Sequence, residues 1–104
     1  MAEAACRLTS VFPKQEMYGF TSQVRRAAAS VPANIAEGYG RESKGNYIQF
    51  LRIAQGSVKE LETHLLLAVR IDLIGESAVQ PIMVRCDTVG KMLHGLIRSV
   101  ENSN

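Results

Sequence analysis

Apolar residues recur along this 104-residue chain at steps of three and four, the spacing of one face of an α-helix. No segment shows the sustained apolar and polar alternation that predicts a half-buried strand. The pattern therefore predicts an all-α protein with helices over about 2–10, 21–39, 44–74 and 77–100. Because the connections between them are short, we expect a single domain, residues 1–104, folded as an up-and-down antiparallel four-helix bundle.

The second predicted helix combines a core-facing stripe with a proline. The stripe comprises Phe20, Val24, Ala28, Val31 and Ile35. Pro32 lies inside this helix and removes a main-chain hydrogen bond, which predicts either a bend or two abutting helices. Asn34 and Glu37 lie one turn apart beside it, so we expect their polar groups to satisfy backbone left unpaired by Pro32. Gly38 is interpreted as a stop signal of the helix.

The third predicted helix carries two stripes. The main one predicts the bundle core and comprises Tyr47, Leu51, Ala54, Val58, Leu61, Leu65, Ala68 and Val69. A second, heptad-like seam follows positions 53, 57, 60, 64, 67 and 71, half of which are polar. Because two contact faces indicate neighbours on both sides of the helix, we expect Ile53, Leu67 and Ile71 to contact another copy of the chain.

A face of small residues lies opposite the core stripe of the second predicted helix. Its members are Ser22, Arg26, Ala29 and Ala33. Small residues allow another backbone to approach closely, and Arg26 can reach a carboxylate of a neighbouring subunit. This pattern predicts a subunit interface, and the alternative is a solvent face of helix-favouring alanines.

The net charge of +2 is too small by itself to indicate binding to nucleic acid or to an anionic membrane. The distribution is more informative, because residues 7–52 carry seven basic and three acidic side chains. Candidate phosphate contacts are Arg25, Arg41, Lys44, Arg52, Lys59 and Arg70. The alternative is that these cations solubilise helices and pair with nearby glutamates. Several copies in one assembly would multiply a weak patch.

Catalytic motifs are absent from the sequence, which contains no H-E-x-x-H, P-loop or G-x-S-x-G pattern. Glu60, Glu62 and His64 form the best metal candidate, but only Glu60 and His64 share a helix face, and two ligands are too few. We therefore expect no enzyme, no metal and no cofactor. Tyr39, between two glycines, has two interpretations, stacking on a base or packing over the bundle end, and packing is preferred.

The cellular compartment is indicated by the cysteines and by hydropathy. Cys6 and Cys86 are isolated, so the chain has no disulfide framework and fits a reducing cytoplasm. No run approaches the roughly 18 apolar residues of a membrane span, and no membrane partner is expected.

Blocks of residues across the first two thirds of the chain resemble a known family. They are Phe12-Pro13-Lys14, Tyr18-Gly19, Thr21 to Ala28, Val31 to Gly38, Phe50-Leu51, Gly56-Ser57 and Glu60 to Thr63. Together they resemble the four-helix-bundle proteins linked to 23S rRNA intervening sequences. Relatives begin with an additional aromatic-bearing stretch, so the resemblance implies a shortened first helix or a start that was assigned late.

The resemblance implies self-assembly. Its expected form is a ring-like homo-oligomer, usually a pentamer, related to the basic accessory protein of diversity-generating retroelements. The expected partners are therefore other copies of the chain, with RNA or DNA as one further partner and a protein partner as the alternative.

Overall fold

The computed structural model describes residues 2, 4–5 and 14–103 of the chain. They form three long helices, α2 (Lys14–Tyr39), α3 (Lys44–Arg70) and α4 (Glu76–Glu101). Residues 2, 4 and 5 are also helical, and the rest of the helix predicted over residues 2–10 lies outside the described residues. These parts of the chain contain no β-strand, which confirms the all-α class.

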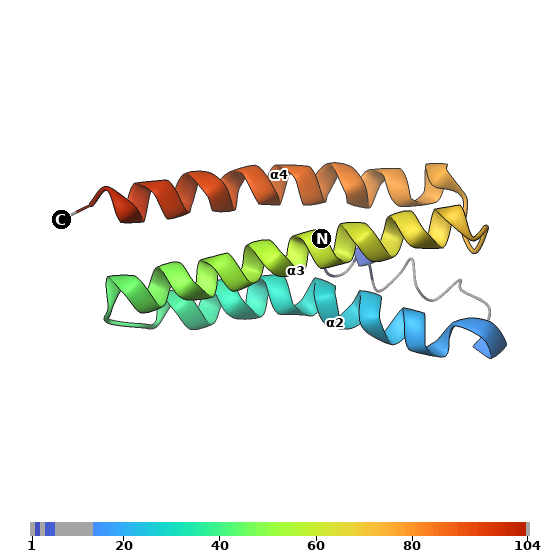
Figure 1. Cartoon of the computed structure of the whole chain (residues 1–104), viewed down its shortest axis with the longest axis horizontal. Coiled ribbons are helices and arrows are strands. Elements are labelled where there is room, and N and C mark those ends of the chain that lie inside the picture. The colour runs from blue at the N-terminus through green and yellow to red at the C-terminus, as the bar shows by residue number, and fades with distance from the viewer. Residues whose placement is uncertain (1, 3, 6–13, 104) are drawn as a thin grey trace.

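The three helices run antiparallel to their neighbours along an elongated molecule of 51 × 21 × 18 Å (Figure 1). α3 lies in the middle and contacts both α2 and α4, whereas α2 and α4 do not contact each other. The central helix therefore packs against two neighbours of its own chain, whereas its second stripe was expected to contact another copy.

Most of the core of α2 and α3 comes from the predicted stripes, although Phe20, Ile35, Tyr47 and Val69 of those stripes are only half-buried. In α3 the buried residues are Leu51, Ala54, Val58, Leu61, Leu65 and Ala68. α2 contributes Val24, Ala27, Ala28 and Val31, and α4 contributes Val79, Ile82, Cys86, Leu93 and Ile97. Each fully buried Leu or Val side chain stabilises the fold by about 1.5–3 kcal/mol. Ala5 is also buried among them, so the first residues of the chain contribute to the same core.

α2 is longer and more regular than predicted. It begins at Lys14, because the strong helix formers between Lys14 and Met17 outweigh the turn tendency of Gly19. It continues without interruption through Pro32, so the alternative of two abutting helices is wrong. Its end at Tyr39 is as predicted, but Gly38 is buried inside its last turn against α3.

Polar side chains near Pro32 connect α2 to α3. The Asn34 amide donates to the carbonyl of Ser30 at 2.8 Å and to its Oγ at 2.9 Å. The Ser30 Oγ in turn lies 2.7 Å from the Ser57 Oγ of α3. Glu37 pairs instead with Arg41. Asn34 thus bonds the Ser30 carbonyl rather than the Ala28 carbonyl, which loses its helical donor at Pro32, and Glu37 does not take the predicted role either.

α3 has a distinct signal at each end. At its start Ser43 is the N-cap, and its Oγ accepts from the Asn46 N–H at 3.3 Å. At its end Asp72 adopts a positive φ of 60°, and the Leu73 N–H donates to the Ala68 carbonyl at 2.9 Å. This bond is that of a Schellman motif. The prediction that the helix continues to residue 74 is wrong, because Asp72 takes the left-handed conformation four residues after Ala68.

The boundaries of α4 lie within one residue of the prediction, 77–100. Pro81 is the sixth residue of α4 and lies inside the helix, so the helical bond to the Ser77 carbonyl is missing there. Among the helices described here, none has the length and apolar character required to cross a membrane.

Candidate functional site

The second seam of α3 divides into an exposed part and a part that faces α2. Ile53, Leu67 and Ile71 have 44%, 47% and 53% of their surface exposed. Ser57 bonds to Ser30, and the His64 ring meets the Phe20 ring of α2 edge-on, with centroids 5.6 Å apart. The three apolar members of the seam, together with the exposed Glu60, are therefore open to another molecule.

His64 lies beside this exposed apolar face. Its Nε2 is buried and has no hydrogen-bond partner in the part of the chain that the structure describes. Glu60 Oε1 lies 3.9 Å from it, beyond hydrogen-bond distance. Glu62 points to the other side of α3 and pairs with Lys59. The three metal candidates thus diverge, and no group of three potential ligands forms among the described residues.

The small-residue face of α2 is open. Ser22, Arg26, Ala29 and Ala33 are all exposed, on the side of α2 that points away from the core. This placement is compatible with both interpretations of the face, a subunit interface and a solvent-exposed surface.

The basic stripe of α3 consists of Arg52, Lys59 and Arg70, which are all exposed. Arg52 pairs with Glu101 at 2.8 Å, and Lys59 pairs with Glu62 at 3.3 Å. Exposed pairs of this kind contribute about 0–1 kcal/mol each. The stripe extends over about 27 Å of helix, since each residue adds about 1.5 Å. These cations therefore lie along one line of α3, and Arg52 and Lys59 are held there by weak ion pairs.

The other predicted cations take separate positions. Arg41 pairs with Glu37 and lies over the Phe50 ring, 5.0 Å from its centroid. Lys44 donates to the main-chain carbonyls of Glu101 and Ser103 and so ties the end of α4 to the start of α3. Arg25 is exposed in the middle of α2. Lys44 and Arg52 thus gather at the C-terminal end of α4, while Arg25 and Arg70 lie elsewhere.

The position of Tyr39 agrees in part with both interpretations, packing over the bundle end and stacking on a base. Its ring meets the Tyr47 ring edge-on at 6.3 Å between centroids, as packing over the bundle end requires. It also remains 77% exposed, so one face of the ring is open to a partner.

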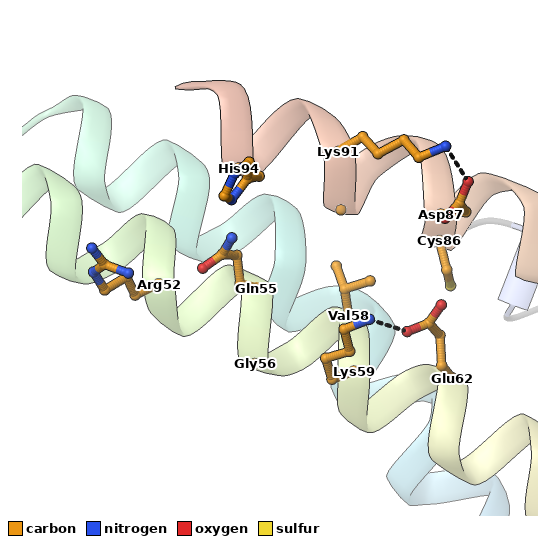
Figure 2. Close-up of a pocket in the computed structure, with 11 residues that line it drawn as sticks. Arg52, Gln55, Gly56, Val58, Lys59, Glu62, Cys86, Asp87, Lys91 and His94 are labelled. Atoms are coloured by element: carbon orange, nitrogen blue, oxygen red, sulfur yellow. Dashed lines mark ion pairs between the residues drawn. The ribbon is translucent and has the colours of Figure 1, made fainter. Parts of the chain in front are cut away.

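The sequence reasoning missed a groove of about 560 Å³ between α3 and α4. Its lining comprises Arg52, Gln55, Gly56, Val58, Lys59, Glu62, Cys86, Asp87, Gly90, Lys91 and His94. Figure 2 shows Gln55 and Glu62 extending from α3 toward α4, with Cys86 and His94 extending in return. The sequence feature that could have indicated this groove is the presence of two glycines, Gly56 and Gly90, within predicted helices.

Cys86 lies at the floor of this groove. Burial, and to a smaller extent the nearby Glu62 carboxylate, raises the pKa of its thiol from 9.0 to about 11. The thiol therefore stays protonated at neutral pH and acts as an apolar contact rather than as a nucleophile.

Comparison with known proteins decides the family. Residues 1–95 match the model of the family described as 23S rRNA-intervening sequence protein. The chain belongs to this family. A solved structure from Bacteroides thetaiotaomicron, described as a protein of unknown function from the S23 ribosomal protein family, is 26% identical. The likeness covers 91% of this chain and 92% of that chain, with a TM-score of 0.81. No curated protein matches at a significant level.

Membership in the 23S rRNA-intervening sequence protein family confirms the resemblance drawn from the residue blocks. The match also extends into α4, beyond the segment between Phe12 and Ile74 that carries the recognisable blocks. In this family member, the groove lies between the two helices α3 and α4, and the exposed apolar face lies elsewhere on α3.

Proposed function

We propose that this family member is a non-catalytic, cytoplasmic homo-oligomer that associates with RNA or DNA through cations of several copies. A completed four-helix bundle and a ring, with five copies favoured, belong to the same proposal. So does kinship with the accessory protein of diversity-generating retroelements.

The observation that carries the proposal is the pair of exposed faces on α3. One is apolar, with Ile53, Leu67 and Ile71, and the other is the basic stripe. Residues 52 and 53 are successive and so lie about 100° apart around the helix axis. Assembly through the apolar face would therefore leave the basic stripe of every copy accessible.

A ring also needs two different contact faces on each subunit, because its interfaces are head-to-tail. The small-residue face of α2 and the apolar face of α3 are two such surfaces, on different helices. The two faces are complementary in size. The small residues of α2 leave room for the larger apolar side chains of α3 to approach closely.

Phosphate binding through the stripe requires the exchange of weak ion pairs. Arg52 and Lys59 each exchange a carboxylate of their own chain for a phosphate, at little net cost because these pairs are exposed. Binding by one copy is expected to be weak, and repetition in the assembly raises the effective affinity by about 10²–10⁴-fold.

The test is binding of single-stranded RNA across a series of salt concentrations. The triple variant Arg52→Gln, Lys59→Gln, Arg70→Gln should bind at least about tenfold more weakly, and its salt slope should fall by about 2. Arg85→Gln, an exposed cation of α4 outside the stripe, is the matched control and should bind as the wild type does. Absence of any binding by the wild type at low ionic strength would remove the proposal.

The alternative function is a protein assembly or adaptor module without nucleic-acid binding. It is favoured by the ion pairs, because Arg41, Arg52 and Lys59 each pair with a glutamate of the same chain. This alternative expects a co-purifying protein partner that nuclease treatment does not release, together with salt-independent association.

A further inference from the structure

Two of the helix positions that line the groove between α3 and α4 have no side chain. Gly56 of α3 and Gly90 of α4 both line it. A Cβ built on either glycine meets no atom within 4 Å. Helix-interior glycines destabilise a helix by about 0.5–1 kcal/mol relative to alanine. Close packing of the helices therefore does not require either glycine. A different role is needed to explain why both positions leave this space open.

The interior of the groove combines an apolar floor with polar walls. Val58 and Cys86 are buried at the floor. Gln55 offers an amide that both donates and accepts, and the Glu62 side chain, only 20% exposed, offers acceptors. His94 extends from α4 toward them (Figure 2). A flat ligand with hydrogen-bonding edges matches this lining better than an aliphatic chain does.

The rim of the groove is cationic. Arg52, Lys59 and Lys91 have side chains that are 56%, 82% and 78% exposed. Only two carboxylates, Glu62 and Asp87, line the same groove. Their ion pairs with Lys59 and Lys91 are drawn in Figure 2. Arg52 is paired with Glu101, which does not line the groove. An anionic ligand would therefore bind by replacing the carboxylates of these exposed, weak ion pairs.

The size of the groove limits the ligand further. A volume of about 560 Å³ lies within the range of small-ligand sites, about 300–1,000 Å³. It admits one base with its sugar but not a double helix, whose bases are paired and stacked. Single-stranded RNA, in contrast, can present unstacked bases to a pocket.

We propose that this groove binds one nucleotide unit of single-stranded RNA, with the base between Gly56 and Gly90 and its phosphates at the cationic rim. The inference rests on the proposed function, because it assigns a binding site to the association with RNA. Gln55 and Glu62 contact the edge of the base, while Arg52, Lys59 and Lys91 contact the flanking phosphates.

The experiment fills the groove without removing a charge. Gly90→Leu places a side chain in the open space, and Gly95→Leu on the same helix is the matched control. Gly95 is exposed, lies outside the groove and also has no atom within 4 Å of an added Cβ. The probe is a short fluorescein-labelled oligouridylate at low ionic strength, with anisotropy as the readout and unlabelled duplex RNA as the competitor.

Gly90→Leu should bind the probe about tenfold or more weakly, because one stacked base is worth about 1–3 kcal/mol. Its salt slope should match the wild type, since no cation is lost. Gly95→Leu should bind normally, and duplex RNA should compete poorly. Circular dichroism checks that helicity is retained, and Gly56→Leu repeats the test from the other wall if Gly90→Leu fails to fold.

Two outcomes separate this inference from the proposed function. Wild-type binding that the groove-filling variants leave unchanged, or that duplex RNA competes equally well, overturns the groove assignment alone. A wild-type protein that binds no probe at any salt concentration overturns the proposed function as well.

Discussion

Gly38 of α2 lies so close to Phe50 of α3 that a Cβ on Gly38 would stand 2.7 Å from the Phe50 Cβ. The same added atom would lie 3.1 Å from the Tyr47 ring. Two helices approach this closely only where one of them has no side chain. The glycine therefore sets the separation of α2 and α3 at this end of the molecule and places Arg41 over Phe50.

Gly38→Ala is expected to lower the free energy of unfolding by about 1–3 kcal/mol, because the methyl group overpacks a closed contact. Gly56→Ala is the control, since its added methyl meets open space and should stabilise the protein by about 0.5–1 kcal/mol. Urea unfolding followed by circular dichroism measures both. Opposite signs for the two substitutions are the expected result, and equal stabilisation would contradict the close contact.

Asp72→Gly is expected to stabilise the protein, because Asp72 occupies a left-handed conformation at φ 60° that glycine adopts without steric cost. The gain is about 0.5–1 kcal/mol, which raises the Tm by a few degrees. Asp72→Val should lower the Tm, since a β-branched side chain disfavours this conformation more strongly. A Tm of the valine variant equal to or above that of the wild type would show that α3 does not end with residue 72 in the left-handed conformation.

The core was predictable from the sequence because it depends on spacing along one helix. Leu51, Val58 and Leu65 recur every seven residues and are all buried. The end of α3 was harder to predict, since Asp72 makes the turn before residue 74, where the helix was expected to end. A local glycine is a strong signal, whereas a left-handed aspartate is not, and here it is accompanied by the packing of Leu73 and of Phe20 from α2 against Ala68.

The candidate sites likewise have one part that the sequence predicts and one part that it does not predict. The exposed positions of Ile53 and Leu67 follow from helical periodicity, so their placement could be expected. The groove could not, because it depends on which residues of α4 lie beside α3. The role of Gly38 likewise depends on its partner Phe50, twelve positions further along the chain. The contacts between residues of different helices therefore could not be predicted from the sequence.

Cys86 is expected to react slowly with iodoacetamide, because its pKa of about 11 leaves little thiolate at neutral pH. In a Cys6→Ser background, labelling at pH 8 should be about 100-fold slower than that of a thiol with an ordinary pKa of 9.0, since the thiolate fraction falls tenfold per pKa unit. Labelling as fast as that of the urea-unfolded chain would contradict the burial.

The same shift predicts a pH dependence of stability. The folded state binds the thiol proton more tightly than the unfolded chain does. Its contribution to stability is thus fully present below about pH 9 and is lost as pH rises toward about 11. Cys86→Ala should remove this part of the alkaline decline, although it lowers stability at pH 7. An unchanged decline would assign the effect to other groups.

Ala33→Glu tests the small-residue face of α2. A large charged side chain should prevent close approach of another subunit and lower the oligomer mass, while helicity stays unchanged because glutamate is a good helix former. Ala78→Glu, on an exposed position of α4, should leave the mass as it is. Sedimentation velocity measures both, and an intact oligomer for Ala33→Glu would show that this face is solvent-exposed.

The central claim is that α3 assembles copies of the chain through Ile53, Leu67 and Ile71. It is tested most directly by native mass at micromolar concentration for three proteins, the wild type, Leu67→Glu and Leu66→Glu. The two leucines are adjacent and similarly exposed, 47% and 53%, but they face different sides of α3. We predict a multiple of the 11.4 kDa chain for the wild type and Leu66→Glu, and a single chain for Leu67→Glu. A monomeric wild type, or the same mass for all three proteins, would contradict the claim.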